Sequence, residues 1–323
     1  MTSHFWSPRC SVEPAGVFPF LYGAVALVPG TLLNGRYKVI RELGKGGMGE
    51  IFVGRDTLLG REVAIKVQTA RTFESTDDYV YYNERMDREC NRMRDVLEIR
   101  GIPRVFDEGR IGRSDRRFLV MELVGGVTLA EWIEMHEPVP VAAVASVLAQ
   151  LCEILGRLHE KGYVHCDVTP GNVMIQSDGC VRLLDVGIST AVGGLNTEPC
   201  GSPYYAPPEQ YMPDEVLTAQ VDVFPLGVLL FRMAAGEVPY AGIEHPFDGT
   251  ERAFPLGLRA VMPDDLRALG LTMVALDPKD RPRVADELPG YLRPMLPAFG
   301  SAAAPKATKP DPTAYYRRGL WRL

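Results

Sequence analysis

A glycine-rich turn with β-type residues on both sides constrains the fold of this chain more than any other feature. The segment LGKGGMGEIFV places Gly44, Gly46 and Gly49 in a G-x-G-x-x-G spacing. In a dinucleotide-binding turn a helix follows such glycines directly, whereas here the next residues, EIFVGRD, form a β-type run. The pattern therefore favours a turn between two antiparallel strands, where backbone amides can approach phosphates because no Cβ intervenes.

The hydrophobic pattern of the chain changes once. Short β-type runs separated by turn signals occupy residues 37–67, residues 77–97 favour a helix, and a further β-type run at 116–124 ends at a Gly-Gly break. Helical patterns dominate after this break, and the longest covers residues 141–162. The sequence therefore predicts an α+β fold with a small antiparallel β-rich lobe, a hinge and a larger, mainly helical lobe.

Composition excludes several classes of protein. The chain has 323 residues, 46% of them hydrophobic and 24% charged, which suffices for one large or two moderate globular domains. Its six cysteines show no C-x-x-C or C-x-x-H spacing, which argues against structural zinc and against a disulfide framework. Because the formal net charge is -6, we expect no nucleic-acid partner, and the cysteine pattern favours a cytoplasmic protein.

Neither end of the chain is expected to carry the chemistry, and the N-terminal extension is expected to be either disordered or packed. Residues 1–35 form an N-terminal extension, whose apolar stretch is shorter than the roughly 20 residues of a membrane span and is broken by Pro19 and Pro29. Residues 298–323 are rich in Ala, Pro and Lys and lack an apolar period, so we expect a C-terminal tail that leaves the fold. We predict no membrane span.

A lysine and three oxygen-bearing side chains follow the glycine turn in a fixed order. Lys66 lies in VAIK, among apolar residues that predict a buried strand, and a buried ammonium group needs an anionic partner. HCDVTPGN then supplies Asp167 and Asn172, and LLDVGIS supplies Asp185. Taken singly each of these would more often be a loop cap or a turn residue, so it is their order along the chain that sets them apart.

In this order the motifs resemble those of a eukaryotic-type protein kinase, and most of all those of the bacterial Ser/Thr kinases. The resemblance extends from about Arg36 to about Leu296. It implies a bilobal protein kinase domain over residues 36–297. The implied parts are an N-lobe (36–121), a hinge (122–126) and a C-lobe (127–297).

The resemblance implies that the chain binds ATP. The implied ATP-binding residues lie in the glycine turn, the next strand, the first helix and the hinge: Gly44, Lys45, Gly46, Gly47, Met48, Gly49, Ala64, Lys66, Glu89, Met121, Glu122 and Val124. Lys66 would hold the α- and β-phosphates and pair with Glu89, with Glu84 as the alternative. Met121 would line the back of the adenine pocket, beside backbone hydrogen bonds from Glu122 and Val124.

The same resemblance implies the catalytic residues and the metal. Asp167 would accept the proton of a substrate hydroxyl, with Lys66, Asn172 and Asp185 completing the catalytic set. Asn172 and Asp185 would hold Mg²⁺. The substrates would be proteins with Ser or Thr acceptors, because GSPYY resembles the platform that Ser/Thr kinases place beside the acceptor.

Two further motifs carry structural expectations. Glu209, at the end of GSPYYAPPEQ, and Arg281, in DPKDRP, should form a buried ion pair, because the bidentate fork of arginine offsets desolvation. Asp222 is implied to anchor the loop that carries Asp167.

Three positions depart from the family pattern. Cys166 replaces an arginine, Thr169 replaces a lysine that contacts the γ-phosphate, and Val186 replaces a phenylalanine. These changes leave open a pseudokinase that binds nucleotide or docks partners, while a small-molecule kinase is disfavoured by the complete GSPYYAPPEQ segment. Because Cys166 offers no cation to a phosphate, we also predict activity without phosphorylation of the loop at 188–200.

Overall fold

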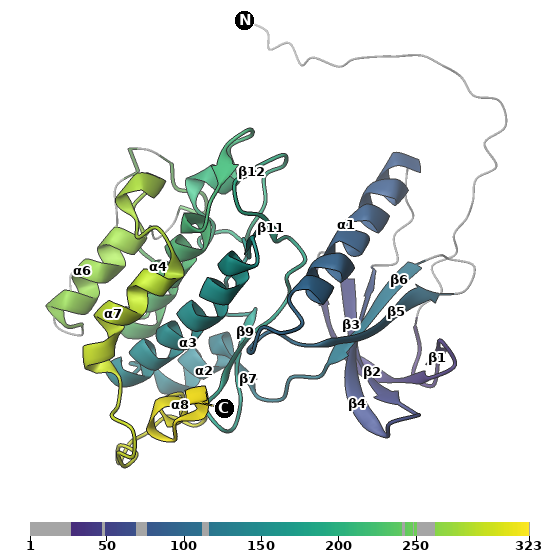
Figure 1. Cartoon of the computed structure of the whole chain (residues 1–323), viewed down its shortest axis with the longest axis horizontal. Coiled ribbons are helices and arrows are strands. Elements are labelled where there is room, and N and C mark those ends of the chain that lie inside the picture. Colours follow the sequence, from purple (N-terminus) through teal and green to yellow (C-terminus); the bar gives the residue numbers. More distant parts are fainter. Residues whose placement is uncertain are drawn as a thin grey trace, which may run out of the picture.

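The computed structural model describes residues 27–46, 49–68, 76–111, 116–240, 243–247, 249–250 and 262–322. They form two lobes, one built on a β-sheet with a long helix beside it and the other mainly helical (Figure 1). The predicted bilobal α+β fold is confirmed.

The N-lobe is an antiparallel sheet with the strand order β1-β2-β3-β4-β6-β5. Its strands are β1 (Leu32–Leu33), β2 (Tyr37–Gly46), β3 (Gly49–Asp56), β4 (Arg61–Gln68), β5 (Val105–Ile111) and β6 (Arg116–Glu122). Gly46 pairs with Gly49, so the predicted antiparallel pairing of the strands on either side of the glycine turn is confirmed. The helix α1 (Thr76–Asp95) packs beside β5 and β6.

The C-lobe is built around two long helices. Its helices are α2 (Leu129–His136), α3 (Val141–Glu160), α4 (Gln220–Ala235), α6 (Asp264–Met273), α7 (Leu288–Leu292) and α8 (Ala314–Arg317). Its short strands are β7 (Val127–Thr128), β8 (Tyr163–Val164), β9 (Val173–Ile175), β10 (Val181–Leu183), β11 (Thr190–Ala191), β12 (Gly194–Leu195) and β13 (Val216–Leu217). Single 3₁₀ turns lie at Pro208–Gln210, Pro278–Asp280, Ala285–Glu287, Arg293–Met295 and Leu320–Arg322.

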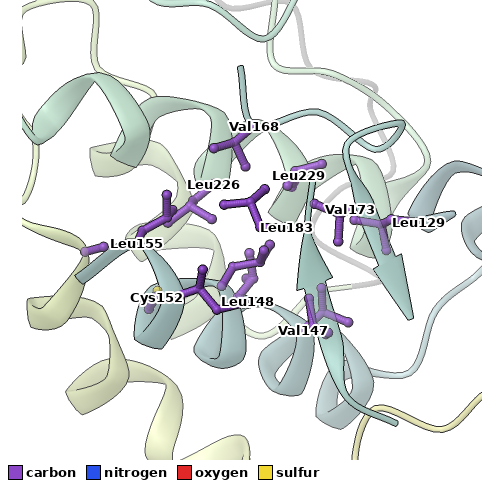
Figure 2. Packing of buried hydrophobic residues seen from close by; sticks show 14 of the residues in the cluster. Leu129, Val147, Leu148, Cys152, Leu155, Val168, Val173, Leu183, Leu226 and Leu229 are labelled. Atoms are coloured by element: carbon purple, nitrogen blue, oxygen red, sulfur yellow. The ribbon is translucent and has the colours of Figure 1, made fainter. Parts of the chain in front are cut away.

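The C-lobe core positions the loops between its strands. Figure 2 shows Leu148 of α3 and Leu226 of α4 pointing into the same interior as Val168, which follows β8, and Leu183 of β10. All four side chains are at most 1% exposed. Burying one such leucine or valine stabilises the fold by about 1.5 to 3 kcal/mol, so the loop containing Val168 is fixed to a rigid base.

Helix α3 is apolar on most of its circumference. Within the described part of the chain it is the one helix long and apolar enough to cross a membrane by length and composition. However, 78% of its most apolar window is buried inside the protein, as in a core helix.

The C-terminal residues do not leave the fold as predicted. In the segment 298–322, Ala314 is 4% exposed and Tyr315 is 8% exposed. The hydroxyls of Tyr315 and Tyr316 donate to the carboxylate of Glu153 on α3, at 2.9 and 3.0 Å. The expectation of a free tail was wrong because two tyrosine side chains make this contact, which needs no apolar period.

Part of the N-terminal extension is packed, which is one of the two alternatives that the sequence left open. β1 lies within the expected N-terminal extension and pairs with β2, and Leu27 is buried against the N-lobe core. The fold therefore includes residues from 27 onward.

Candidate active site

A buried ion network joins the two lobes. Lys66 of β4 is 3% exposed, and its Nζ donates to Glu89 Oε1 at 2.7 Å and to Asp185 Oδ1 at 2.8 Å. Burial opposes the charge of Lys66, but the two carboxylates hold its pKa above the usual range. Burial likewise opposes ionisation of Asp185, yet Lys66 holds the pKa of that carboxyl below its usual value. The network therefore holds the charged ammonium group of Lys66 beside the ionised carboxylate of Asp185.

The choice between two helix glutamates is decided by this geometry. Glu89 lies on the buried face of α1, at 5% exposure. Glu84 is exposed and instead faces Arg88 at 3.5 Å. Lys66 therefore pairs with Glu89, as the sequence favoured, and Glu84 plays no part in the network.

The glycine turn lies next to Lys66. Gly44, Lys45, Gly46 and Gly49 belong to β2 and β3, whereas Gly47 and Met48 lie outside the described residues. At Gly49 a Cβ atom would lie 2.6 Å from the carbonyl oxygen of Val67, so only glycine allows β3 to approach β4 this closely. The charge of Lys45 is paired with Glu50 at 2.9 Å.

The expected adenine-side residues lie at the junction of the lobes. Met121 pairs with Ala64 across β6 and β4. The backbone N–H of Glu122 donates to the Arg104 carbonyl at 2.8 Å, so a contact from Glu122 to a base would have to use its carbonyl oxygen. Val124 follows β6 and is half-buried.

The side chain of Glu122 has a separate task. Its carboxylate binds Arg182 of β10, with N–O distances of 2.8 and 2.7 Å. Burial opposes ionisation of Glu122, but the Arg182 contacts hold the pKa of this carboxyl below its usual value. The ion pair therefore ties the hinge to the C-lobe.

Asp167 receives hydrogen bonds on both carboxylate oxygens. Asn172 Nδ2 donates to Asp167 Oδ2 at 2.8 Å, and Ser202 Oγ donates to Asp167 Oδ1 at 2.6 Å. These contacts fix the orientation of the carboxylate at the surface of the C-lobe. Ser202 was not singled out from the sequence as a partner of Asp167, although the GSPYY motif that contains it was.

Buried Asp222 of α4 anchors the catalytic loop, residues 165–172. Its carboxylate accepts the backbone N–H groups of His165 and Cys166 at 2.8 and 2.9 Å, and faces His159 Nε2 at 2.8 Å. Burial would raise the pKa of Asp222, but these donors hold it below its usual value. The predicted anchoring role is confirmed.

His165 links the catalytic loop to the loop of Asp185. The backbone N–H of Asp167 donates to His165 Nδ1 at 3.2 Å, which places the ring proton on Nε2. Nε2 then lies 3.0 Å from the carbonyl oxygen of Leu184, its acceptor. Sequence reasoning missed this role, although His165 stands at the start of the HCDVTPGN motif.

Asn172 and Asp185 fit the expected magnesium site. The backbone N–H of Leu184 donates to the Asn172 carbonyl at 2.7 Å, so the two loops lie side by side. Asn172 donates to Asp167 through Nδ2, and its Oδ1 is the atom that a cation would use. Among the described residues no cluster of three or more His, Cys, Asp or Glu side chains forms a metal site. Two oxygen ligands suit Mg²⁺, which completes its shell with waters and phosphate oxygens.

The three departures from the family pattern are accommodated by packing. Val186 is fully buried in the C-lobe core, where a phenylalanine was expected. Cys166 is 2% exposed, and burial raises the pKa of its thiol well above the usual value. Thr169 is half-buried, and its carbonyl accepts the N–H of Asn172 at 3.0 Å.

The expected ion pair between Glu209 and Arg281 is present and bidentate. The two guanidinium nitrogens lie 2.6 and 3.0 Å from the carboxylate oxygens of Glu209. Arg281 also donates to the carbonyls of Ala275, Leu276 and Gln220, which satisfies its remaining three N–H groups. The ion pair between Glu209 and Arg281 fixes the end of the activation segment, which we define as residues 185–209.

Comparison with known proteins agrees with this geometry. The profile of the family described as Protein kinase domain matches residues 37–288. The serine/threonine-protein kinase pkn2 of Myxococcus xanthus is 34% identical over 308 residues, which are 88% of this chain and 36% of that protein. The serine/threonine-protein kinase PknB of Mycobacterium tuberculosis is 31% identical over 269 residues, 79% of this chain and 42% of that protein.

The chain thus spans less than half the length of these curated relatives. The family profile, however, covers more than half of the chain and includes every described residue of the ion network and the catalytic loop. The chain belongs to the protein kinase family, with eukaryotic-type Ser/Thr kinases as its relatives.

Proposed function

We propose that this chain transfers the γ-phosphoryl group of ATP to Ser and Thr hydroxyls of proteins, including its own. The observation that carries the proposal is the arrangement of Asp167. Its carboxylate is held by Asn172 and Ser202, while Lys66 bridges Glu89 and Asp185 in the ion network between the lobes.

Each group has a defined chemical task in this proposal. Lys66 binds the α- and β-phosphates, and Glu89 keeps its ammonium group in place. Asp167 orients the substrate hydroxyl and accepts its proton as the oxygen attacks the γ-phosphorus, while the bond from that phosphorus to the bridging oxygen breaks and ADP leaves. Asn172 and Asp185 would hold Mg²⁺, which would neutralise charge on the phosphate oxygens. The proposal places the reaction in the cytoplasm, in protein signalling, without a nucleic-acid partner or a membrane span.

The pseudokinase alternative is the second candidate, and Thr169 is the observation that favours it. One missing preorganised charge raises the barrier by on the order of 2 to 4 kcal/mol, which slows transfer without abolishing it. The four groups required for transfer remain in place. The balance therefore favours an enzyme of reduced rate.

Incubation with radiolabelled ATP, Mg²⁺ and a generic protein substrate tests the proposal. We expect label in the substrate and in the chain itself, with phosphoserine and phosphothreonine after acid hydrolysis. Label that depends on a contaminating kinase is identified by an Asp167→Asn preparation purified in the same way. Absence of transfer beside intact ATP binding would establish the pseudokinase, and predominant phosphotyrosine would overturn the interpretation of GSPYY.

A further inference from the structure

The side chain of Gln210 joins the catalytic loop to the activation segment. It is 1% exposed, and its Nε2 donates to the carbonyl oxygen of Cys166 at 2.8 Å and to that of Cys200 at 3.3 Å. Cys166 directly precedes Asp167, and Cys200 lies two residues before Ser202. One amide therefore holds the chain on both sides of the hydrogen bond between Asp167 and Ser202.

The backbone between these two points is shaped around this amide. Gly201 has a φ of +100°, which favours glycine, and a Cβ atom there would lie 2.7 Å from Gln210 Nε2 and 2.6 Å from Ala206 Cβ. The activation segment therefore passes directly over the Gln210 amide. At Gly201, between Cys200 and Ser202, there is no room for a side chain.

A second buried amide holds the backbone of Gln210. Asn196 is 3% exposed, and its Nδ2 lies 3.2, 2.9 and 3.0 Å from the carbonyl oxygens of Glu209, Gln210 and Met212. The N–H of Cys200 also donates to the Gln210 carbonyl, at 3.0 Å. Asn196 thus ties the first half of the activation segment to the residues that follow it.

We propose that Gln210 is a positioning residue for phosphoryl transfer, supported by Asn196. Gln210 sets the position of Ser202 relative to Asp167. Because Ser202 orients the Asp167 carboxylate, Gln210 aligns this general base with the substrate hydroxyl. Because both amides are neutral, the alignment does not depend on a phosphate in the activation segment. The inference rests on the proposed kinase activity and deepens it.

The test compares two buried glutamines of the same chemistry. Gln150 of α3 is 3% exposed, and its Nε2 also donates to two backbone carbonyls, those of Gly179 and Pro312. Its contacts lie at the β9–β10 turn and the C-terminal segment, and it takes no part in the proposed chemistry. Gln210→Glu and Gln150→Glu each replace an N–H donor by an oxygen facing carbonyl oxygens, with almost no change of shape.

We would measure kcat, the KM for a protein substrate, the Kd for ATP and the melting temperature on phosphatase-treated full-length protein. Gln210→Glu should lower kcat by at least about tenfold while the Kd for ATP stays within about twofold of wild type. Gln150→Glu should lower the melting temperature and keep kcat within about twofold. A smaller loss of kcat in Gln210→Glu, an equal loss in Gln150→Glu, or a parallel loss of ATP affinity would overturn the proposal.

A second variant, Gln210→Met, removes the N–H donor without adding a charge and keeps the volume of the side chain. If Gln210→Glu does not fold, Gln210→Met tests the positioning role with the same limits on kcat and on the Kd for ATP. Failure of the inference is separable from failure of the proposed function. An inactive wild-type protein refutes the kinase activity, whereas an active wild type with an equally active Gln210→Met variant refutes only the role of Gln210.

Discussion

The two sides of the candidate active site are held by different kinds of interaction. On the side proposed to bind the phosphates, here called the phosphate side, ionisable groups form a network in which Lys66 and Glu89 are buried and Asp185 is half-buried. On the acceptor side, the neutral amides of Asn196 and Gln210 bind backbone carbonyls. The charged side chains are suited to bind a charged ligand, whereas the amides bind the backbone of the protein itself. The phosphate side should therefore respond strongly to loss of charge, and the acceptor side should respond little to a phosphate added to or removed from the activation segment.

The largest expected effect is at Lys66. Lys66→Met should abolish measurable transfer, a loss of at least about a thousandfold or 4 kcal/mol of barrier, because no cation remains for the phosphates. The variant should keep its circular dichroism spectrum. Lys38→Met is the matched control, since Lys38 is an exposed lysine on β2 of the same sheet, and its rate should stay within about twofold. Retained turnover in Lys66→Met would contradict the claim that transfer requires the positive charge of Lys66.

Asp167→Asn tests the point where the two sides meet. The amide can still accept from Ser202 but cannot take a proton, so transfer should fall by about a thousandfold or more. ATP binding, measured by calorimetry, should be unchanged because Asp167 takes no part in the Lys66 network. Asp178→Asn, at an exposed turn in the same lobe, should leave the rate unaltered. A similar loss of rate in both variants would mean that the loss in Asp167→Asn does not come from the missing proton acceptor.

A smaller effect is expected where a charge pair serves structure rather than chemistry. Arg281→Lys cannot bind Glu209 in a bidentate manner and leaves buried carbonyls without a donor, so the free energy of unfolding should fall by about 2 to 3 kcal/mol. Urea denaturation measures this change. Arg88→Lys, in an exposed pair with Glu84, should change the stability by less than about 0.5 kcal/mol. Equal changes in the two variants would show that burial of the pair is irrelevant to stability.

The same contrast explains what the sequence could predict. Lys66, Asp167, Asn172 and Asp185 stand in motifs whose order along the chain resembles that of protein kinases, and this resemblance was enough to indicate them as candidate site residues. The bilobal fold followed from the change between β-type and helical periodicity. The pairing of Glu209 with Arg281 followed in the same way from a family motif.

The neutral contacts could not be predicted in this way. Gln210 and Asn196 bind backbone carbonyls, which every residue carries, so their sequence positions give no sign of their partners. The C-terminal segment escaped prediction for the same reason, since Trp132 donates to the Pro310 carbonyl at 2.9 Å and Gln150 donates to the Pro312 carbonyl at 3.3 Å. Contacts to backbone become visible only when the path of the chain is known.

The smallest expected effect concerns phosphorylation of the activation segment. Ser189 is 1% exposed and donates to the Val186 carbonyl, whereas Thr197 is exposed. Cys166 provides no cation for a phosphate at either place, and Asn196 already ties the segment to residues 209–212. Replacing Ser189, Thr190 and Thr197 together by alanine should therefore change the initial rate on an external substrate by less than about tenfold, or 1.4 kcal/mol of barrier.

The basic residue best placed to contradict this prediction is Arg92 of α1. Its NH1 donates to the Gly187 carbonyl at 3.3 Å, so it already contacts the activation segment close to Asp185. If Arg92 instead bound a loop phosphate, the triple alanine variant and phosphatase-treated wild type would both lose more than about tenfold in rate, and Arg92→Met would remove the difference between treated and untreated enzyme. Equal rates in all of these preparations would mean that the activation segment is ordered without a phosphate, which agrees with its attachment through the neutral amides of Asn196 and Gln210.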